Sequence, residues 1–291
     1  MSWRTIYVST QCHLSFKNGY LVIRNEDVVT IHLSEINTLI IDSNSSSLSI
    51  FLISKLIERR VKIIFCDEKH NPSCELVPYY LSYNTSKMIM NERKWERDKC
   101  DLLWQVIIKY KILYQSIVLK SVGLATKEKQ LLQYSANVMK GDSSNREGHA
   151  AKVYFNALFG KDFSRNQENE INAALNYGYS ILLSMFNREI VGVGYITQIG
   201  VHHRGENNPF NLSCDLMEPF RPIIDKIVFE NRENEFNKEY KFKLIDIMNQ
   251  KFSYNGQKQY LTQIINTFVR KTLENLSEGI IDKSLFEYDW L

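Results

Sequence analysis

Two nearby segments of the sequence bring imidazole and carboxylate side chains close together, a combination that could bind a metal ion. The first is Gly200–Arg204, which includes two adjacent histidines, and the second contains Asp215 and Glu218. On a helix, carboxylates three residues apart project from one face, about one turn from each other. Two such charges are unfavourable without a cation nearby, so the pair predicts a divalent metal ion. Pro219 and Pro222 follow directly and indicate that the pair lies at a helix end.

A second interpretation of the acidic pair needs no metal. Asp215 could instead complement the partial positive charge at the N-terminus of its helix, with Asn211 or Ser213 as the capping residue. The residues alone leave both interpretations open. His202 and His203 are consecutive and therefore point in different directions, so we expect one of the two to be structural.

Glu147 is a further candidate acid. Ser144 and Glu147 have the spacing of a capping box, in which the glutamate side chain accepts a hydrogen bond from the serine backbone amide. Gly148, directly after it, is a poor helix former, and the small side chains of Ala150 and Ala151 allow another element to approach closely. The sequence leaves Glu147 either as a helix cap or as a functional acid.

The absence of common motifs and the composition exclude several classes of protein. No glycine-rich phosphate loop, H-E-x-x-H or G-x-S-x-G motif occurs, so the common nucleotide-binding and hydrolase classes have no support. The five cysteines are scattered, which argues against a disulfide framework or a thiolate zinc site and fits a reducing cytoplasm. A net charge of +3 means that any DNA contact must come from local patches. No apolar run approaches the ~20 residues that cross a bilayer, so we expect a cytoplasmic protein without a membrane segment.

The N-terminal part of the chain has the pattern of strands. From Trp3 to about Asp42, short clusters of Ile, Val, Leu and Tyr alternate with turn signals. Asn18-Gly19 predicts a two-residue hairpin turn, because both residues tolerate positive φ. Residues 47–60 have helical spacing, and residues 61–65 return to a strand pattern.

The remainder of the chain has helical periodicity. We expect helices near 88–123, 126–140, 144–159, 167–198, 211–231, 241–252 and 257–275, with Gly200 capping the end of a helical run. The predicted fold class is α+β: a small N-terminal β-rich domain, residues 1–82, followed by a larger all-helical catalytic domain, residues 83–291. A chain of 291 residues has room for two domains.

Taken together, these segments resemble the CRISPR-associated adaptation integrase family. The matching features, in order, are a glutamate near a helix start, an N-x-x-L-N-Y-G-Y stretch at residues 172–179, a G-x-x-H segment ending at His203, and D-L-M-E-x-F-R-P at residues 215–222. The resemblance covers essentially the whole chain. The length and the opening of the chain resemble the versions found with type II systems.

The resemblance implies the roles of the candidate residues. Glu147, His203 and Glu218 become the catalytic metal ligands, Asp215 becomes an auxiliary carboxylate, and His202 has no assigned role. Some relatives have aspartate where this chain has Glu218. Two carboxylates and one neutral imidazole form a site suited to Mg²⁺ or Mn²⁺.

The resemblance also implies a function and partners. The function is a metal-dependent DNA endonuclease and integrase of antiviral defence, which inserts short DNA fragments (spacers) into a CRISPR repeat array. The 3′-OH of the fragment attacks a phosphodiester in a transesterification, and water in its place would give hydrolysis. The implied partners are DNA, a second copy of the chain in a homodimer through the β-rich dimerisation domain, a small CRISPR-associated ferredoxin-like protein that completes a heterohexamer, and other type II adaptation proteins.

Two other functions remain open from the sequence. One is a metal-dependent nuclease that acts mainly by hydrolysis on branched DNA. The other is a non-catalytic DNA-binding scaffold, in which Glu147 caps a helix and Asp215 and Glu218 only complement a helix dipole.

Overall fold

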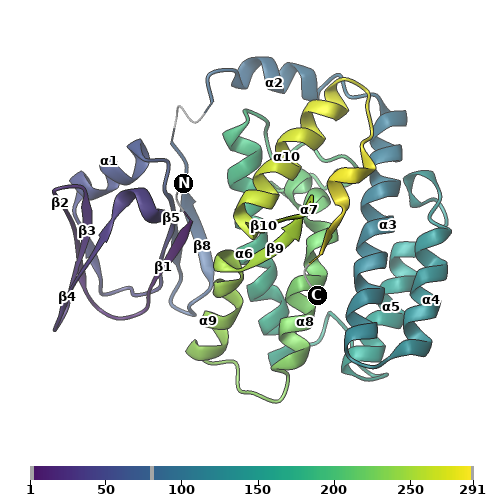
Figure 1. Cartoon of the computed structure of the whole chain (residues 1–291), viewed down its shortest axis with the longest axis horizontal. Helices are drawn as coiled ribbons and strands as arrows, with labels where there is room; N and C mark the ends of the chain where they lie inside the picture. The colour runs from purple at the N-terminus through teal and green to yellow at the C-terminus, as the bar shows by residue number, and fades with distance from the viewer. Residues whose placement is uncertain (1–2, 79–81, 290–291) are drawn as a thin grey trace. The chain divides into compact units, whose positions relative to one another are not determined.

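Strands dominate the first part of the chain and helices the rest (Figure 1). The computed structural model describes residues 3–78 and 82–289 and divides the chain into two units. The first unit comprises Met1–Leu81 with Ile245–Gln250 and Tyr260–Thr262, and the second comprises Ser82–Leu244, Lys251–Gln259 and Gln263–Leu291. The predicted α+β class, β-rich first and mostly helical afterwards, is confirmed.

Two four-stranded sheets form the first unit. The mixed sheet has the order β1-β5-β7-β8, with the first three strands parallel and the last antiparallel: β1 (Arg4–Val8), β5 (Ile36–Ile41), β7 (Lys62–Cys66) and β8 (Pro72–Leu76). The other sheet has the order β4-β3-β2-β6: β4 (Val28–His32), β3 (Tyr20–Arg24), β2 (His13–Lys17) and β6 (Ser47–Leu48). All six residues of β5 are buried, as expected for a strand in the middle of a parallel sheet.

The predicted hairpin at Asn18-Gly19 is confirmed. It joins β2 to β3, and its two residues have φ of 50° and 88°. Helix α1 (Ile50–Glu58), capped by the Ser49 side chain, buries Leu52 and Leu56. These two leucines pack with the inward side chains of both sheets, including Leu14 and Leu39, in one hydrophobic core.

The second unit is built mainly of helices. The helices after residue 84 are α2 (Thr85–Glu92), α3 (Arg97–Ser121), α4 (Ala125–Ala136), α5 (Arg146–Phe159), α6 (Glu170–Gly192), α7 (Asn211–Met217), α8 (Arg221–Glu230), α9 (Lys238–Asp246) and α10 (Leu261–Ser277). The expected helix over 88–123 is wrong at its start, because the chain leaves the helix between Glu92 and Arg97.

A small sheet corrects the expectation that this part is entirely helical. Strands β9 (Lys251–Tyr254) and β10 (Gln257–Tyr260) interrupt the predicted helices 241–252 and 257–275, and β11 (Tyr288–Asp289) pairs with β9. The turn between β9 and β10 is Asn255-Gly256, with φ of 50° and 73°. It is the same two-residue turn signal as Asn18-Gly19.

Helix α3 is the central helix of the second unit. It packs against α4 and α5, which run beside it in Figure 1, and against α7 and α8. By length and composition α3 could cross a membrane, contrary to the expectation of no such run, but 67% of its apolar window is buried inside the protein. Burial of that kind is typical of a core helix. Its buried residues include the polar side chains of Lys111, Gln115 and Ser116.

The end of the chain packs on the helical core. The Tyr114 hydroxyl, on α3, donates to the carbonyl oxygen of Phe286 at 2.6 Å, and the Tyr288 hydroxyl donates to the carbonyl oxygen of Pro219 at 2.6 Å. The ring of Tyr288 also stacks on Phe220 at a centroid distance of 4.8 Å. The short turn that connects α7 to α8 is therefore stabilised by its contacts with Tyr288.

Candidate active site

Glu147 lies in the first turn of α5. That helix begins after Asn145, which has a φ of 50° and whose side-chain oxygen accepts from the Gly148 amide. The Asp142 carboxylate accepts from the amides of Arg146 and Glu147 at 2.8 and 2.9 Å. Asp142 and Asn145 thus supply the cap, so the capping-box interpretation of Glu147 is wrong and its carboxylate is left for another contact.

That contact is with Lys111 of α3. The Lys111 ammonium donates to Oε1 of Glu147 at 2.6 Å and lies 2.6 Å from Oε2 of Glu218. Burial alone would lower the pKa of Lys111, but the charges of Glu218 and Glu147 outweigh burial and raise it. In the same way burial would raise the pKa of Glu147, but the Lys111 ammonium holds it below its usual value. Lys111 and Glu147 are therefore both charged at neutral pH.

Glu218 is the most buried of the candidate acids apart from Asp215. It opens the single 3₁₀ turn Glu218–Phe220 between α7 and α8, in which Pro219 removes an amide where no helical bond is needed. Its Oε1 pairs with the Arg221 guanidinium at 3.0 Å. The predicted position of the acidic pair at a helix end is confirmed. The suggested caps Asn211 and Ser213 are wrong, because α7 begins after Phe210 without a side-chain cap.

Asp215 orients the histidine segment and does not serve a helix terminus. Its carboxylate is fully buried and accepts from the amide of His202 at 2.7 Å and from that of His203 at 3.3 Å. It also pairs with Nδ1 of the His203 ring. The hydrogen bond to Asp215 is the main reason that the pKa of His203 is raised. With Nδ1–H donating to Asp215, Nε2 is the ring nitrogen left to bind a ligand.

Gly200 allows this close approach. A Cβ atom on residue 200 would lie 2.3 Å from the carbonyl oxygen of His203 and 2.7 Å from Oδ2 of Asp215. The expectation that Gly200 caps a helix is wrong, since α6 ends at Gly192 and residue 200 lies in a loop. Only glycine fits at this position, because any side chain would clash with the loop that contains His203.

The adjacent histidines have different surroundings, as predicted. The His202 ring stacks on Trp104 of α3 at a centroid distance of 4.3 Å and an interplanar angle of 3°. Burial lowers the pKa of His202, which keeps the ring neutral. The side chain of His203, in contrast, is 47% exposed. His202 therefore packs the segment against the core, and His203 is the ring that can reach a ligand.

The structure brings the candidate ligands into one region but not into a finished metal cluster. Within residues 3–78 and 82–289, no three His, Cys, Asp or Glu side chains converge as an ion requires. Glu147 and Glu218 are linked through Lys111, and His203 is near enough for both acids to raise its pKa. Oε2 of Glu218 is buried and lies 2.6 Å from the Lys111 ammonium. The donors suit a hard divalent cation, but an ammonium group lies between the two acids.

Sequence reasoning missed Lys111 and Arg221. Lys111 occupies the buried stripe of α3 that also contains Ile107, Ile108 and Gln115. A lysine in such a stripe is rarely buried without acidic partners, so its position was the signal that could have found it. Arg221 belongs to the quoted motif at residues 215–222, yet its contact with Glu218 needs the turn at Pro219 to be known.

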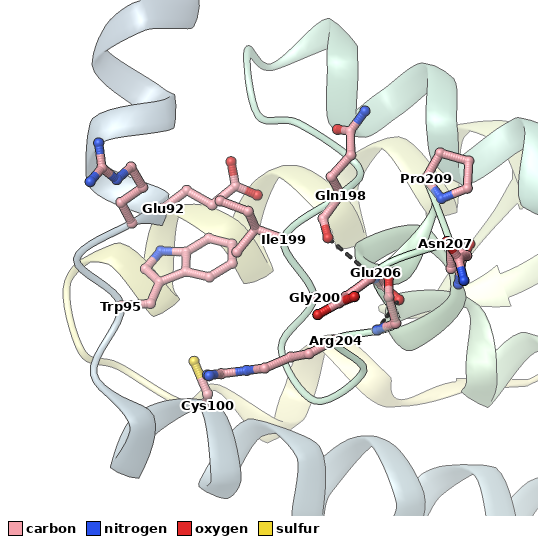
Figure 2. Close-up of a pocket in the computed structure, with 14 residues that line it drawn as sticks. Glu92, Trp95, Cys100, Gln198, Ile199, Gly200, Arg204, Glu206, Asn207 and Pro209 are labelled. Atoms are coloured by element: carbon pink, nitrogen blue, oxygen red, sulfur yellow. Dashed lines mark hydrogen bonds between the residues drawn. The ribbon is translucent and has the colours of Figure 1, made fainter.

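A cleft of about 800 Å³ lies beside the histidine segment (Figure 2). Its lining includes Gly200 and Arg204 on one side and Glu92 and Trp95 on the other, and Figure 2 shows Arg204 extending toward Cys100. Burial raises the pKa of Glu92 to about 8, although its carboxylate accepts from the Ile196 amide at 3.2 Å. At neutral pH this acid is therefore largely protonated.

Comparisons with known proteins identify the class. The family model described as CRISPR associated protein Cas1 matches residues 6–265. The chain is 31% identical over 290 residues to a CRISPR-associated endonuclease Cas1 of Neisseria meningitidis serogroup C, a match that covers 98% of this chain and 94% of that protein. A Francisella tularensis subsp. novicida relative of the same description is 28% identical over 284 residues, which covers 87% of this chain and 89% of that protein. These matches place the chain among the CRISPR-associated proteins. It belongs to the Cas1 family.

Solved structures share the fold. A casposase bound to an integration product superposes with a TM-score of 0.78 at 19% identity, covering 100% of this chain and 95% of that one. A CAS1 protein from Thermotoga maritima gives 0.69 at 15% identity, covering 94% and 97%. A Cas6-RT-Cas1–Cas2 complex gives 0.71 at 17% identity, covering 99% of this chain and 36% of that chain. The predicted family and its class of function, a CRISPR-associated endonuclease and integrase, are confirmed at the level of the family.

Proposed function

We propose that this protein inserts short DNA fragments into a CRISPR repeat array, using Mg²⁺ or Mn²⁺ held by Glu147, His203 and Glu218. One observation carries the proposal: the half-buried Glu147 of α5 and the buried Glu218 of the turn before α8 share one cation position, beside a histidine whose Nδ1 is already fixed. Two carboxylates that share one ammonium group lose much of their hydration, and this cost lowers the stability of the fold. The arrangement is therefore better explained by a functional site than by stability alone.

Three residues position the proposed metal ligands: Asp215, Arg221 and Asp142. Asp215 holds the His203 ring through Nδ1 and leaves Nε2 for the ion, and Arg221 holds Oε1 of Glu218 while Oε2 lies at the cation position that Lys111 now occupies. Glu147 is aimed by the Asp142 cap of α5. A bound divalent ion would polarise the scissile phosphate and stabilise the charge that develops during in-line attack by a 3′-OH.

The partners are part of the same proposal. The likeness to the Cas6-RT-Cas1–Cas2 complex and to a DNA-bound casposase supports DNA and a small ferredoxin-like partner. We assign residues 1–82 to contact between two copies of the chain, residues 83–291 to catalysis, and the assembly to a heterohexamer of the type II kind. DNA backbone contacts would then be spread over several weakly basic subunits. The five cysteines are free thiols, which suits the cytoplasm.

Strand transfer in vitro tests the proposal. A short duplex with free 3′-OH ends is mixed with plasmid that carries a leader and repeat, the small partner protein and Mn²⁺. Loss of one metal ligand removes several kcal/mol of transition-state stabilisation, so Glu218→Ala should reduce joining by roughly 10³-fold with the fold retained. Glu230→Ala, at an exposed acid of α8, is the matched control.

The products decide between the proposal and its alternatives. Covalent joining that requires metal, 3′-OH and Glu218 supports the integrase. Metal-dependent cleavage of branched DNA without joining would favour the nuclease. Unchanged DNA in every reaction would favour the non-catalytic scaffold.

A further inference from the structure

We propose that Lys111 is an internal counter-cation of the metal site. Its ammonium holds Glu147 and Glu218 in the metal-free protein and withdraws from them when a divalent ion binds. The inference rests on the proposed function, because it takes these two acids as metal ligands. Lys111 is then a positioning residue that keeps both acids in place before the ion arrives.

The first support is the place that Lys111 occupies. Its Nζ atom lies 2.6 Å from an oxygen of each acid, although the two acids come from different helices. Those oxygens are the ones a shared ion would use, since the other oxygen of Glu218 is engaged by Arg221. One position cannot hold an ammonium group and a metal ion together, so binding at the two oxygens must be mutually exclusive.

The second support is the balance of charge. Two acids, Glu147 and Glu218, pair with two bases, Lys111 and Arg221, so the formal charges of these four side chains cancel without any metal. A divalent ion added to this neutral and largely buried cluster would leave two uncompensated positive charges. Burying unbalanced charge is strongly unfavourable, so one resident cation has to withdraw.

Lys111 is the cation that can move. Arg221 is fixed from a second side, because its guanidinium lies 4.7 Å from the centre of the Tyr179 ring. The Tyr179 hydroxyl in turn donates to the buried carboxylate of Asp225, so the arginine is held within a network. Lysine carries a compact charge on a flexible four-carbon stem and can change direction without disturbing its helix.

A second acceptor for the ammonium is already present on α3. Gln115 lies one turn beyond Lys111, on the same face, and is 2% exposed. Its Oε1 atom is buried and has no hydrogen-bond partner among residues 3–78 and 82–289. Buried acceptors are rarely left unpaired, so this one is explained if it receives the Lys111 ammonium when metal occupies the acids.

Direct measurement of Mn²⁺ binding tests the inference. The signal of free Mn²⁺ in electron paramagnetic resonance gives the dissociation constant for wild type, Lys111→Met and the control Lys109→Met, which removes the same charge from the exposed side of α3. Without its competitor, the ion should bind Lys111→Met about tenfold more tightly, a coupling of ordinary size. Lys109→Met should bind as wild type does.

Thermal unfolding gives a second readout. In EDTA the melting temperature of Lys111→Met should be below that of wild type, since two acids lose their shared cation, and saturating Mn²⁺ should raise it more than it raises wild type. Gln115→Leu keeps Lys111 but removes its second acceptor. That variant should melt in EDTA as wild type does and bind Mn²⁺ about threefold more weakly, so it decides the question even if Lys111→Met folds poorly.

The outcomes separate the inference from the proposed function. Absence of Mn²⁺ binding that depends on Glu218 in wild type would overturn the proposed metal site. Glu218-dependent binding that is equal or weaker in Lys111→Met, or unchanged in Gln115→Leu, would overturn the role of Lys111 alone.

Discussion

Two histidine–aspartate pairs in the molecule are built alike, one in each unit. In the first unit, Nδ1 of His70 is 2.9 Å from the Asp42 carboxylate, and in the second, Nδ1 of His203 pairs with Asp215. Both aspartate side chains are fully buried, and the two histidine side chains are 43% and 47% exposed. Taken alone, neither pair identifies a site.

The surroundings of the two pairs differ. Asp42 also accepts from the Tyr7 hydroxyl, so it ties the end of β5 to β1 and to the loop of His70. Asp215 accepts instead from two consecutive amides of the loop that carries its own histidine, and this histidine faces two further acids. Asp215 belongs to the candidate site because its hydrogen bonds position the loop and the ring of His203, whereas the bonds of Asp42 join separate elements of the first unit.

Removal of each aspartate charge should separate the two roles most clearly. Asp215→Asn weakens the bonds that aim His203, and loss of such support around metal ligands costs about 10–100-fold in metal affinity or activity. Asp42→Asn should lower the free energy of unfolding by about 1–3 kcal/mol through weaker buried bonds, with joining unchanged. Mn²⁺ affinity, strand transfer and urea unfolding of both variants check this. Equal losses of joining in the two variants would remove the distinction.

A smaller effect is expected from the glycine that lets Asp215 approach. Gly200→Ala would place a methyl group against the His203 carbonyl and the Asp215 carboxylate, and overpacking of this kind costs about 1–3 kcal/mol. Because the strain falls on the loop of His203, Mn²⁺ affinity should fall as well. In Gly205→Ala the added Cβ would have no neighbour nearer than 3.5 Å, so this control should match wild type in both measurements.

The smallest effect concerns the neighbouring histidine. His202→Ala removes the stack on Trp104, which is worth about 0.5–1.5 kcal/mol beyond the buried area. Urea unfolding should detect that loss, while strand transfer at saturating Mn²⁺ should remain within about twofold of wild type. A loss of joining as large as that of Asp215→Asn would show that His202 does more than pack.

Local signals made much of the fold predictable from the sequence. The Asn18-Gly19 turn and the alternating strands around it depend on neighbouring residues, and both were found. Asn255-Gly256 carries the same signal and lies between the expected helices 241–252 and 257–275, but the spacing of the apolar residues on either side predicts helices and not strands. The hairpin forms instead, and β9 also pairs with β11, which is distant in sequence and cannot be predicted from neighbouring residues.

The type and spacing of the acids made them candidates and the resemblance implied their roles, whereas their electrostatics required the structure. Glu147 and Lys111 are 36 residues apart, and Glu218 lies still further along the chain. Nothing in the spacing of Ser144 and Glu147 indicates that Asp142 has taken over the helix cap. The partners that set the charge of these acids are distant in sequence, so they can be identified only from the folded structure.

The support of the Glu218 turn by Tyr288 has a consequence for the order of synthesis. Tyr288 is added to the growing chain 69 residues after Pro219, whose carbonyl it binds. A nascent chain therefore contains Glu147, Asp215 and Glu218 before the residue that supports the Glu218 turn has been added.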